Sequence, residues 1–295
     1  MQMICNAQYS NNNGYIPLHR LYYAMNKLEK LYLEIQKEGV LTSNELIKIA
    51  KKTLEIEGLD YKYLFTEYLS KLLKRGQIAR PRRGIYVAKS PYSSRGDHDM
   101  ADRYVIASKN RDTYYLGFHT ALEIHGCAYS FFRTVTVCVS PKKQFRPFEF
   151  QGTKYKAVST KYAELGVETI LKNEHKLKIS NPSRTFIDCL ERPELAGGWE
   201  EVIKSLISLP GVNGNDLLSI LSTFDSKVLY RKVGLVLELL DSSIYYERVL
   251  EDIKNVLQEY TKGQPSYMDR NSPGPLNSEW NIYEIPDLNR MLEGV

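Results

Sequence analysis

The sequence has few of the features that mark secreted or membrane proteins. It contains only four cysteines: Cys5, Cys127, Cys138 and Cys189. No two of them form a C-x-x-C pair or stand close to one of the five histidines, so nothing supports a disulfide framework or a zinc site. Residues 1–15 lack the basic and apolar segments of a signal peptide, and the most apolar runs are far shorter than the ~20 residues that cross a bilayer. We expect a reduced, cytoplasmic protein with no membrane segment, no metal and no other cofactor.

Acidic residues are missing from one stretch of the chain. No aspartate or glutamate lies between Glu67 and Asp97. Eight cations lie there instead: Lys71, Lys74, Arg75, Arg80, Arg82, Arg83, Lys89 and Arg95. Because the whole chain carries only +5, the remainder is net negative. An ordinary protein surface intersperses charges of both signs, so this block indicates a polyanionic partner.

The N-terminal part predicts three helices and a hairpin. Apolar residues at steps of three and four predict a helix over residues 21–37 that ends at Gly39. Thr42 and Glu45 form a capping box that starts a second helix, stopped by Gly58. Asp60 caps a third helix over residues 61–75. Residues 77–80 and 85–89 then predict a β-hairpin around a turn at residues 81–84. This order is that of a winged helix-turn-helix.

The third helix separates an apolar side from a polar side on a helical wheel. Leu64, Phe65, Tyr68, Leu69, Leu72 and Leu73 form the apolar side, which we expect in the core. The polar side and its cationic flanks suit a helix in a major groove, with hydrogen-bonding groups toward base edges and cations toward phosphates. With the hairpin cations, the predicted DNA-binding residues are Lys62, Tyr63, Thr66, Ser70, Lys71, Lys74, Arg75, Arg80, Arg82 and Arg83. Glu67 on the same side fits least well.

The remaining chain predicts a larger α+β domain. A Pro/Ser/Gly-rich joint at residues 90–96 is the best domain boundary, and 295 residues suit two domains. We expect a flexible leader at 1–20, a winged helix-turn-helix domain at 21–96, a mixed α+β domain at 97–262 that becomes helical toward its end, and a loop-rich arm at 263–295. Within the second domain, residues 104–109, 119–125, 200–208, 216–223, 230–241 and 246–260 predict helices. Residues 134–140, 148–159 (broken at Gly152) and 176–179 predict strands, and Asn181 and Pro182 predict the start of another helix.

Several motifs resemble one known family. The run Leu72-Leu73-Lys74-Arg75-Gly76-Gln77-Ile78-Ala79-Arg80, followed by Arg83-Gly84-Ile85-Tyr86, resembles the end of the winged helix in AbiEi antitoxins of abortive-infection, type IV toxin–antitoxin systems. His119-Thr120-Ala121-Leu122-Glu123-Ile124-His125-Gly126, Val135-Thr136-Val137 and the run from Ile179 to Asp188 resemble that family's middle module. The resemblance spans roughly residues 20–260, by the order and spacing of these motifs.

The resemblance implies a non-enzymatic, bifunctional phage-defence protein. Its winged helix would bind double-stranded promoter DNA and repress its own operon, and a homodimer would let two such helices meet half-sites one helical turn apart. Its C-terminal domain would counter a nucleotidyltransferase toxin without needing to bind it. A stand-alone regulator without a toxin is the alternative, because the leader and the tail after Lys262 exceed the family pattern. A nuclease fusion is a weaker alternative, because the nearest E-x-K-like run, residues 149–154, has the wrong spacing.

Three other groups of residues have ordinary structural explanations. Arg184 and Asp188, at i and i+4, predict a helical ion pair worth ~0.3–0.5 kcal/mol. His119 and His125 are six residues apart and would point to different sides of a helix, which favours packing or capping over metal binding. Residues 96–99 spell an HD-like motif, but the partners of a metal site are missing around it.

Overall fold

The computed structural model describes residues 25–89, 101–172, 174–240 and 244–293. The chain divides into two compact units, Met1–Ala101 and Asp102–Val295, which we call unit 1 and unit 2. The predicted leader, the joint at residues 90–96 and the HD-like motif at 96–99 lie outside the described residues. Both units combine helices with sheets, so the predicted mixed α+β class is confirmed at that level.

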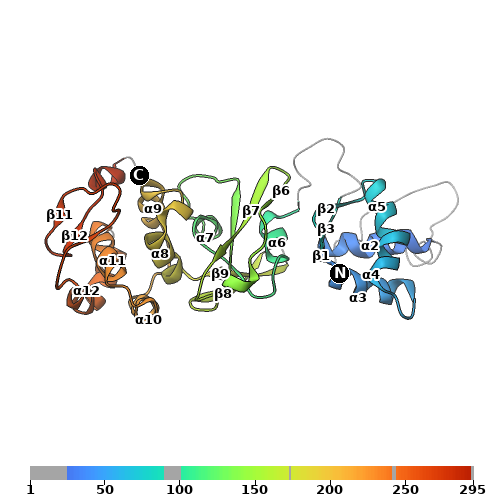
Figure 1. Cartoon of the computed structure of the whole chain (residues 1–295), viewed down its shortest axis with the longest axis horizontal. Coiled ribbons are helices and arrows are strands. Elements are labelled where there is room, and N and C mark those ends of the chain that lie inside the picture. Colours follow the sequence, from blue (N-terminus) through green and yellow to red (C-terminus); the bar gives the residue numbers. More distant parts are fainter. Residues whose placement is uncertain (1–24, 90–100, 173, 241–243, 294–295) are drawn as a thin grey trace. The chain divides into compact units, whose positions relative to one another are not determined.

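Unit 1 contains helices and one small antiparallel sheet (Figure 1). Its elements are α2 (Lys27–Glu38), β1 (Val40–Thr42), α3 (Ser43–Leu54), α4 (Tyr61–Leu64), the π-helical turn η1 (Phe65–Leu69), α5 (Ser70–Lys74), β2 (Ile78–Arg82) and β3 (Ile85–Ala88). The strand order is β1-β3-β2. Apolar side chains from all three helical segments and from the sheet form one buried core, which includes Leu31, Leu46, Leu64 and Tyr86.

Side-chain caps set where the helices of unit 1 begin. The capping box of Thr42 and Glu45 is present, with Glu45 N donating to Thr42 Oγ1 at 3.2 Å and Thr42 N to Glu45 Oε2 at 2.7 Å. A second capping box, which was not predicted, joins Asn26 to Glu29 and begins α2 at Lys27; the predicted start at residue 21 lies outside the described residues. The helix α3 ends at Leu54, before the predicted stop, because Glu55 already adopts a left-handed conformation (φ 54°).

Unit 2 is built around a six-stranded mixed sheet of order β6-β7-β5-β4-β9-β8. Its strands are β4 (Tyr115–Leu116), β5 (Thr134–Val139), β6 (Phe148–Phe150), β7 (Thr153–Ser159), β8 (Val167–Lys172) and β9 (His175–Ser180). The pairs β5–β7 and β4–β9 are parallel, and the other neighbours are antiparallel. Two helices, α6 (Arg103–Ser108) and α7 (His119–His125), pack against this sheet.

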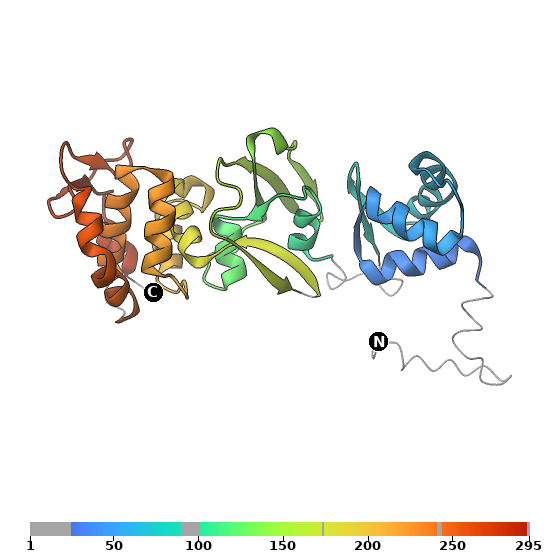
Figure 2. The same ribbon diagram turned by 90° about the horizontal axis from the view of Figure 1, so that it is seen from below.

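Helices make up the other end of unit 2 (Figures 1 and 2). They are α8 (Pro182–Glu191), α9 (Trp199–Leu206), α10 (Gly214–Phe224), α11 (Lys227–Leu239) and α12 (Ile244–Glu259), with short 3-10 turns at η4 (Pro193–Leu195) and η5 (Leu288–Leu292). A further 3-10 turn, η3 (Pro141–Lys143), follows strand β5 of the sheet. As predicted, Asn181 caps α8: its Oδ1 accepts from Arg184 N at 2.8 Å, with Pro182 in the first turn. The predicted rise in helix content toward residue 262 is therefore present.

The last segment has more structure than a loop-rich arm. Residues 266–283 contribute the strands β10 (Ser266–Tyr267), β11 (Leu276–Asn277) and β12 (Ile282–Tyr283), in the order β10-β12-β11. Trp280 is fully buried, and its indole N–H donates to Glu238 Oε2 of α11 at 2.7 Å. Gly234 makes room for this ring, because a Cβ there would lie 2.1 Å from it. The segment thus belongs to the core of unit 2.

Candidate nucleic-acid interface

The third helix of unit 1 is continuous from Tyr61 to Lys74 but contains a π-helical turn. Asp60 begins it, as predicted, by accepting from Tyr63 N at 2.7 Å. The turn at residues 65–69 places one extra residue between two buried leucines, so the fully buried positions are Leu64, Leu69 and Leu72. The other three residues of the predicted apolar side, Phe65, Tyr68 and Leu73, are partly buried and pack against the same core.

Most of the predicted DNA-binding side chains on this helix are exposed. Lys62, Tyr63, Thr66, Lys71, Lys74 and Arg75 reach solvent, while Glu67 and Ser70 are half-buried. Tyr63 is 48% exposed despite its large ring. Because a continuous helix carries all of these residues, the structure brings them together along one element.

Two contacts decide which polar groups on the helix are available to a ligand. Ser70 Oγ donates to the carbonyl oxygen of Thr66 at 2.8 Å, which occupies its proton. Thr66 Oγ1 has no hydrogen-bond partner among the described residues, and the hydroxyl is exposed. Lys71 Nζ lies 3.2 Å from Glu67 Oε2, so the one carboxylate on this side is paired with a cation. Thr66 is consequently better placed than Ser70 to bond a base edge.

The hairpin is confirmed, but its turn is shorter than predicted. Strand β2 runs to Arg82 with an irregularity between Ala79 and Arg82, so Pro81 and Arg82 belong to the strand rather than to the turn. Gly84 takes a positive φ of 95°, which a residue with a side chain rarely adopts. Arg83 is exposed at this tip. The strand β1, which was not predicted, pairs with β3 and extends the hairpin into a three-stranded sheet.

Arg80 differs from the other cations because aromatic rings hold it. Its guanidinium carbon lies 5.4 Å from the ring centres of both Phe65 and Tyr86. Its Nη2 donates to Tyr61 Oη at 3.5 Å, and the hydroxyls of Tyr61 and Tyr86 bond each other. Burial, followed by the hydrogen bond that its hydroxyl makes with Tyr61, raises the pKa of Tyr86 well above its ordinary value. Arg80 is thus a fixed cation beneath the third helix, and the sequence signal for this was only its charge.

The ion pair of Arg184 and Asp188 in unit 2 is not the solvent-exposed pair that the spacing suggested. Both side chains are 1% exposed, and Arg184 Nε lies 2.6 Å from Asp188 Oδ1. Arg184 also donates to Tyr115 Oη at 2.8 Å and to the carbonyl oxygens of Tyr162 and Leu165 at 3.0 and 2.8 Å. Burial raises the pKa of Asp188, against the lowering effect of Arg184. Through these hydrogen bonds Arg184 joins α8 to Tyr115 of strand β4 and to the loop before β8, so we assign the cluster a structural role.

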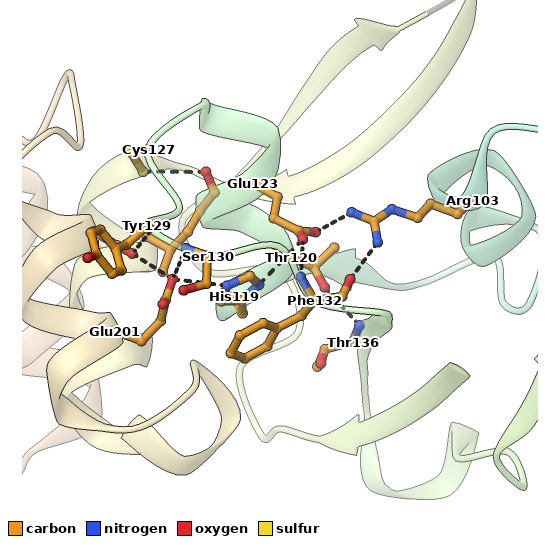
Figure 3. A network of polar contacts seen from close by, with 12 residues as sticks. Arg103, His119, Thr120, Glu123, Cys127, Tyr129, Ser130, Phe132, Thr136 and Glu201 are labelled. Atoms are coloured by element: carbon orange, nitrogen blue, oxygen red, sulfur yellow. Dashed lines mark hydrogen bonds and ion pairs between the residues drawn. The ribbon is translucent and has the colours of Figure 1, made fainter. Parts of the chain in front are cut away.

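The two histidines of α7 make structural contacts, as the predicted packing role requires. His125 Nε2 lies 2.9 Å from the carbonyl oxygen of Ser180. The ring of His119 stacks on Phe132 at 3.8 Å, and its Nε2 lies 3.1 Å from Glu201 Oε1 (Figure 3). Glu201 also accepts from Ser130 N at 2.9 Å. These contacts fix the loop after α7.

The described residues hold no cluster of three or more potential metal-ligating side chains. Three cysteines, Cys127, Cys138 and Cys189, are buried free thiols. Burial raises the pKa of the Cys127 thiol to about 12, so it is protonated near neutral pH. No helix in the described part is long and apolar enough to cross a membrane.

The fold and the charge together define a small helical unit closed by an antiparallel hairpin, with cations on the last helix and on the hairpin. Residues 29–89 match the model of the family described as "Transcriptional regulator, AbiEi antitoxin", which confirms the resemblance to that family over this segment. No curated protein matches the chain. The crystal structure of the RV2827C protein from Mycobacterium tuberculosis is similar over 91% of this chain and 95% of that one, with a TM-score of 0.60 and 13% sequence identity. At that identity the likeness concerns the fold alone.

Proposed function

We propose that the chain is a transcriptional repressor and antitoxin in which unit 1 is a winged helix-turn-helix that binds promoter DNA. The observation that carries this proposal is the exposed cationic face in the same segment that matches the AbiEi regulator family. The third helix would enter the major groove, with Tyr63 and Thr66 toward base edges and Lys62 and Lys74 toward phosphates. The hairpin would place Arg83 on the adjacent backbone.

Unit 2 would supply the antitoxin function. The proposed target is a nucleotidyltransferase toxin, countered with or without a stable complex. The described residues of unit 2 offer no metal-ligating cluster. Asp188 forms a buried ion pair with Arg184. Glu149 lies on strand β6, opposite Lys154 of β7.

Specificity of the DNA-binding face tests the first half of this proposal. Thr66→Ala should lower discrimination between the chain's own promoter and competitor duplex by about 1–3 kcal/mol, with little change in non-specific affinity. Ser70→Ala is the matched control and should have the smaller effect, because its proton is already bonded within the helix. If competitor DNA displaces both variants and the parent equally, the third helix does not read sequence.

Co-expression tests the second half. Residues 102–295 should rescue the growth of cells that express a cognate nucleotidyltransferase toxin, while residues 1–101 should bind promoter DNA without rescue. Rescue by the first unit alone would reverse the assignment. DNA binding without any neighbouring toxin gene would favour the stand-alone regulator.

A further inference from the structure

A cavity of about 490 Å³ lies in unit 1 between the third helix and the hairpin. It is lined by two aromatic and three cationic residues: Tyr61, Phe65, Arg80, Arg82 and Arg83. No carboxylate lines it. The nearest acidic side chains along the third helix are already engaged, since Asp60 caps the helix and Glu67 pairs with Lys71. The cavity therefore combines positive charge with a shape that is open to a ligand.

Arg80 is built into this cavity as a fixed and incompletely satisfied donor. Its guanidinium is held between the rings of Phe65 and Tyr86, with one hydrogen bond to Tyr61. Its Nε is buried, and no acceptor bonds it within the described part of the chain. A buried donor without an acceptor costs free energy, more so when it carries charge. The same rings hold the guanidinium where the residue lines the cavity, so an anionic ligand there would meet a fixed cation.

We propose that this cavity is a phosphate site that takes one backbone phosphate of the bound DNA. This inference rests on the proposed function of unit 1. A guanidinium presents its donors as a planar fork that matches phosphate oxygens, and the aromatic walls fix the plane of that fork. Arg83 at the hairpin tip adds a second, exposed charge to the lining. Arg80 thereby fixes where the DNA backbone lies against the unit, whereas the exposed lysines of the helix act as point charges.

The distinctive claim is that the guanidinium of Arg80 matters beyond its charge. Arg80→Lys keeps the charge but loses Nε and the planar stacking, and should weaken binding of a duplex to the full chain about tenfold with an almost unchanged salt slope. Arg83→Lys is the matched control and should change affinity less than twofold. A thermal melt confirms that both variants are folded. Equal affinities for Arg80→Lys, Arg83→Lys and the parent would overturn the proposal.

A probe without DNA separates this site from the proposed function. The full chain is labelled with ¹⁵N-arginine, and the Nε–Hε resonance of Arg80 is identified as the one that disappears in Arg80→Lys. Titration with inorganic phosphate should shift this resonance. If phosphate shifts that resonance and duplex DNA does not bind, the result supports the phosphate site and contradicts the proposed DNA binding. If DNA binds with a steep salt dependence and neither phosphate nor DNA shifts the resonance, DNA binding stands and the phosphate site is overturned.

Discussion

Removing Arg184 alone tests whether the buried cluster of unit 2 is a structural tie. Arg184→Met keeps most of the aliphatic volume but leaves the Asp188 carboxylate 1% exposed without its cation. It also leaves the carbonyl oxygens of Tyr162 and Leu165 without their donor. Removing one partner of a buried pair costs about 3–5 kcal/mol. For a unit of this size each kcal/mol lowers the melting temperature by about 2–4 °C, so we expect a fall of ~6–20 °C.

Tryptophan fluorescence is a selective assay for this change. Both tryptophans, Trp199 and Trp280, lie in unit 2, so a fluorescence melt reports that unit. Arg290→Ala is the control, because its pair with Asp287 is 74% and 64% exposed and should be worth less than about 1 kcal/mol. The double variant Arg184→Met/Asp188→Leu should regain part of the loss, since it removes the unpaired charge. A cost below about 1 kcal/mol for Arg184→Met would refute the reasoning.

Three further outcomes are expected. Glu67→Gln should raise affinity for any duplex several-fold, because it removes the one carboxylate on the helix face and frees Lys71; unchanged or weaker binding in an anisotropy titration would contradict this. Gly234→Ala should destabilise unit 2 by at least ~1–3 kcal/mol, because the added methyl would overlap Trp280; an unchanged fluorescence melt would remove the C-terminal segment from the core. Burial lowers the pKa of Lys232 from 10.5 to about 8, so the unfolded chain binds the proton more tightly and stability gains as pH rises from about 8 to 10.5. Lys232→Met should lack this gain in denaturant titrations at pH 8 and pH 10, and an identical pH dependence would count against it.

Short-range signals in the sequence located much of the fold. The capping residues Thr42, Asp60 and Asn181 each accept the predicted backbone N–H, because a cap depends only on neighbours within one turn. The helix α7 and the break at Gly152 between β6 and β7 follow from equally local rules. These features are the ones that need no knowledge of distant contacts.

Features that depend on distant residues were missed or misjudged. The strands β1, β4 and β8 are short or lack a regular alternation of apolar and polar residues. They are stabilised by pairing with β3, β5 and β9, respectively. The spacing of Arg184 and Asp188 correctly predicted the pair but not its burial, which the sheet and α8 impose together. The cationic residues of the candidate interface could be found from charge, yet the aromatic setting of Arg80 required the hairpin to fold against the third helix.

The central claim is that one face of unit 1 binds DNA through its cations. The most direct measurement is the salt dependence of duplex binding by the full chain. Arg82→Ala/Arg83→Ala should lower the slope of log K against log salt by about 1–2. Each phosphate contact that is lost leaves about one more counterion on the DNA when the protein binds. Lys51→Ala/Lys52→Ala removes two exposed cations from α3 and should leave the slope unchanged. Equal slopes for the two double variants would contradict the account.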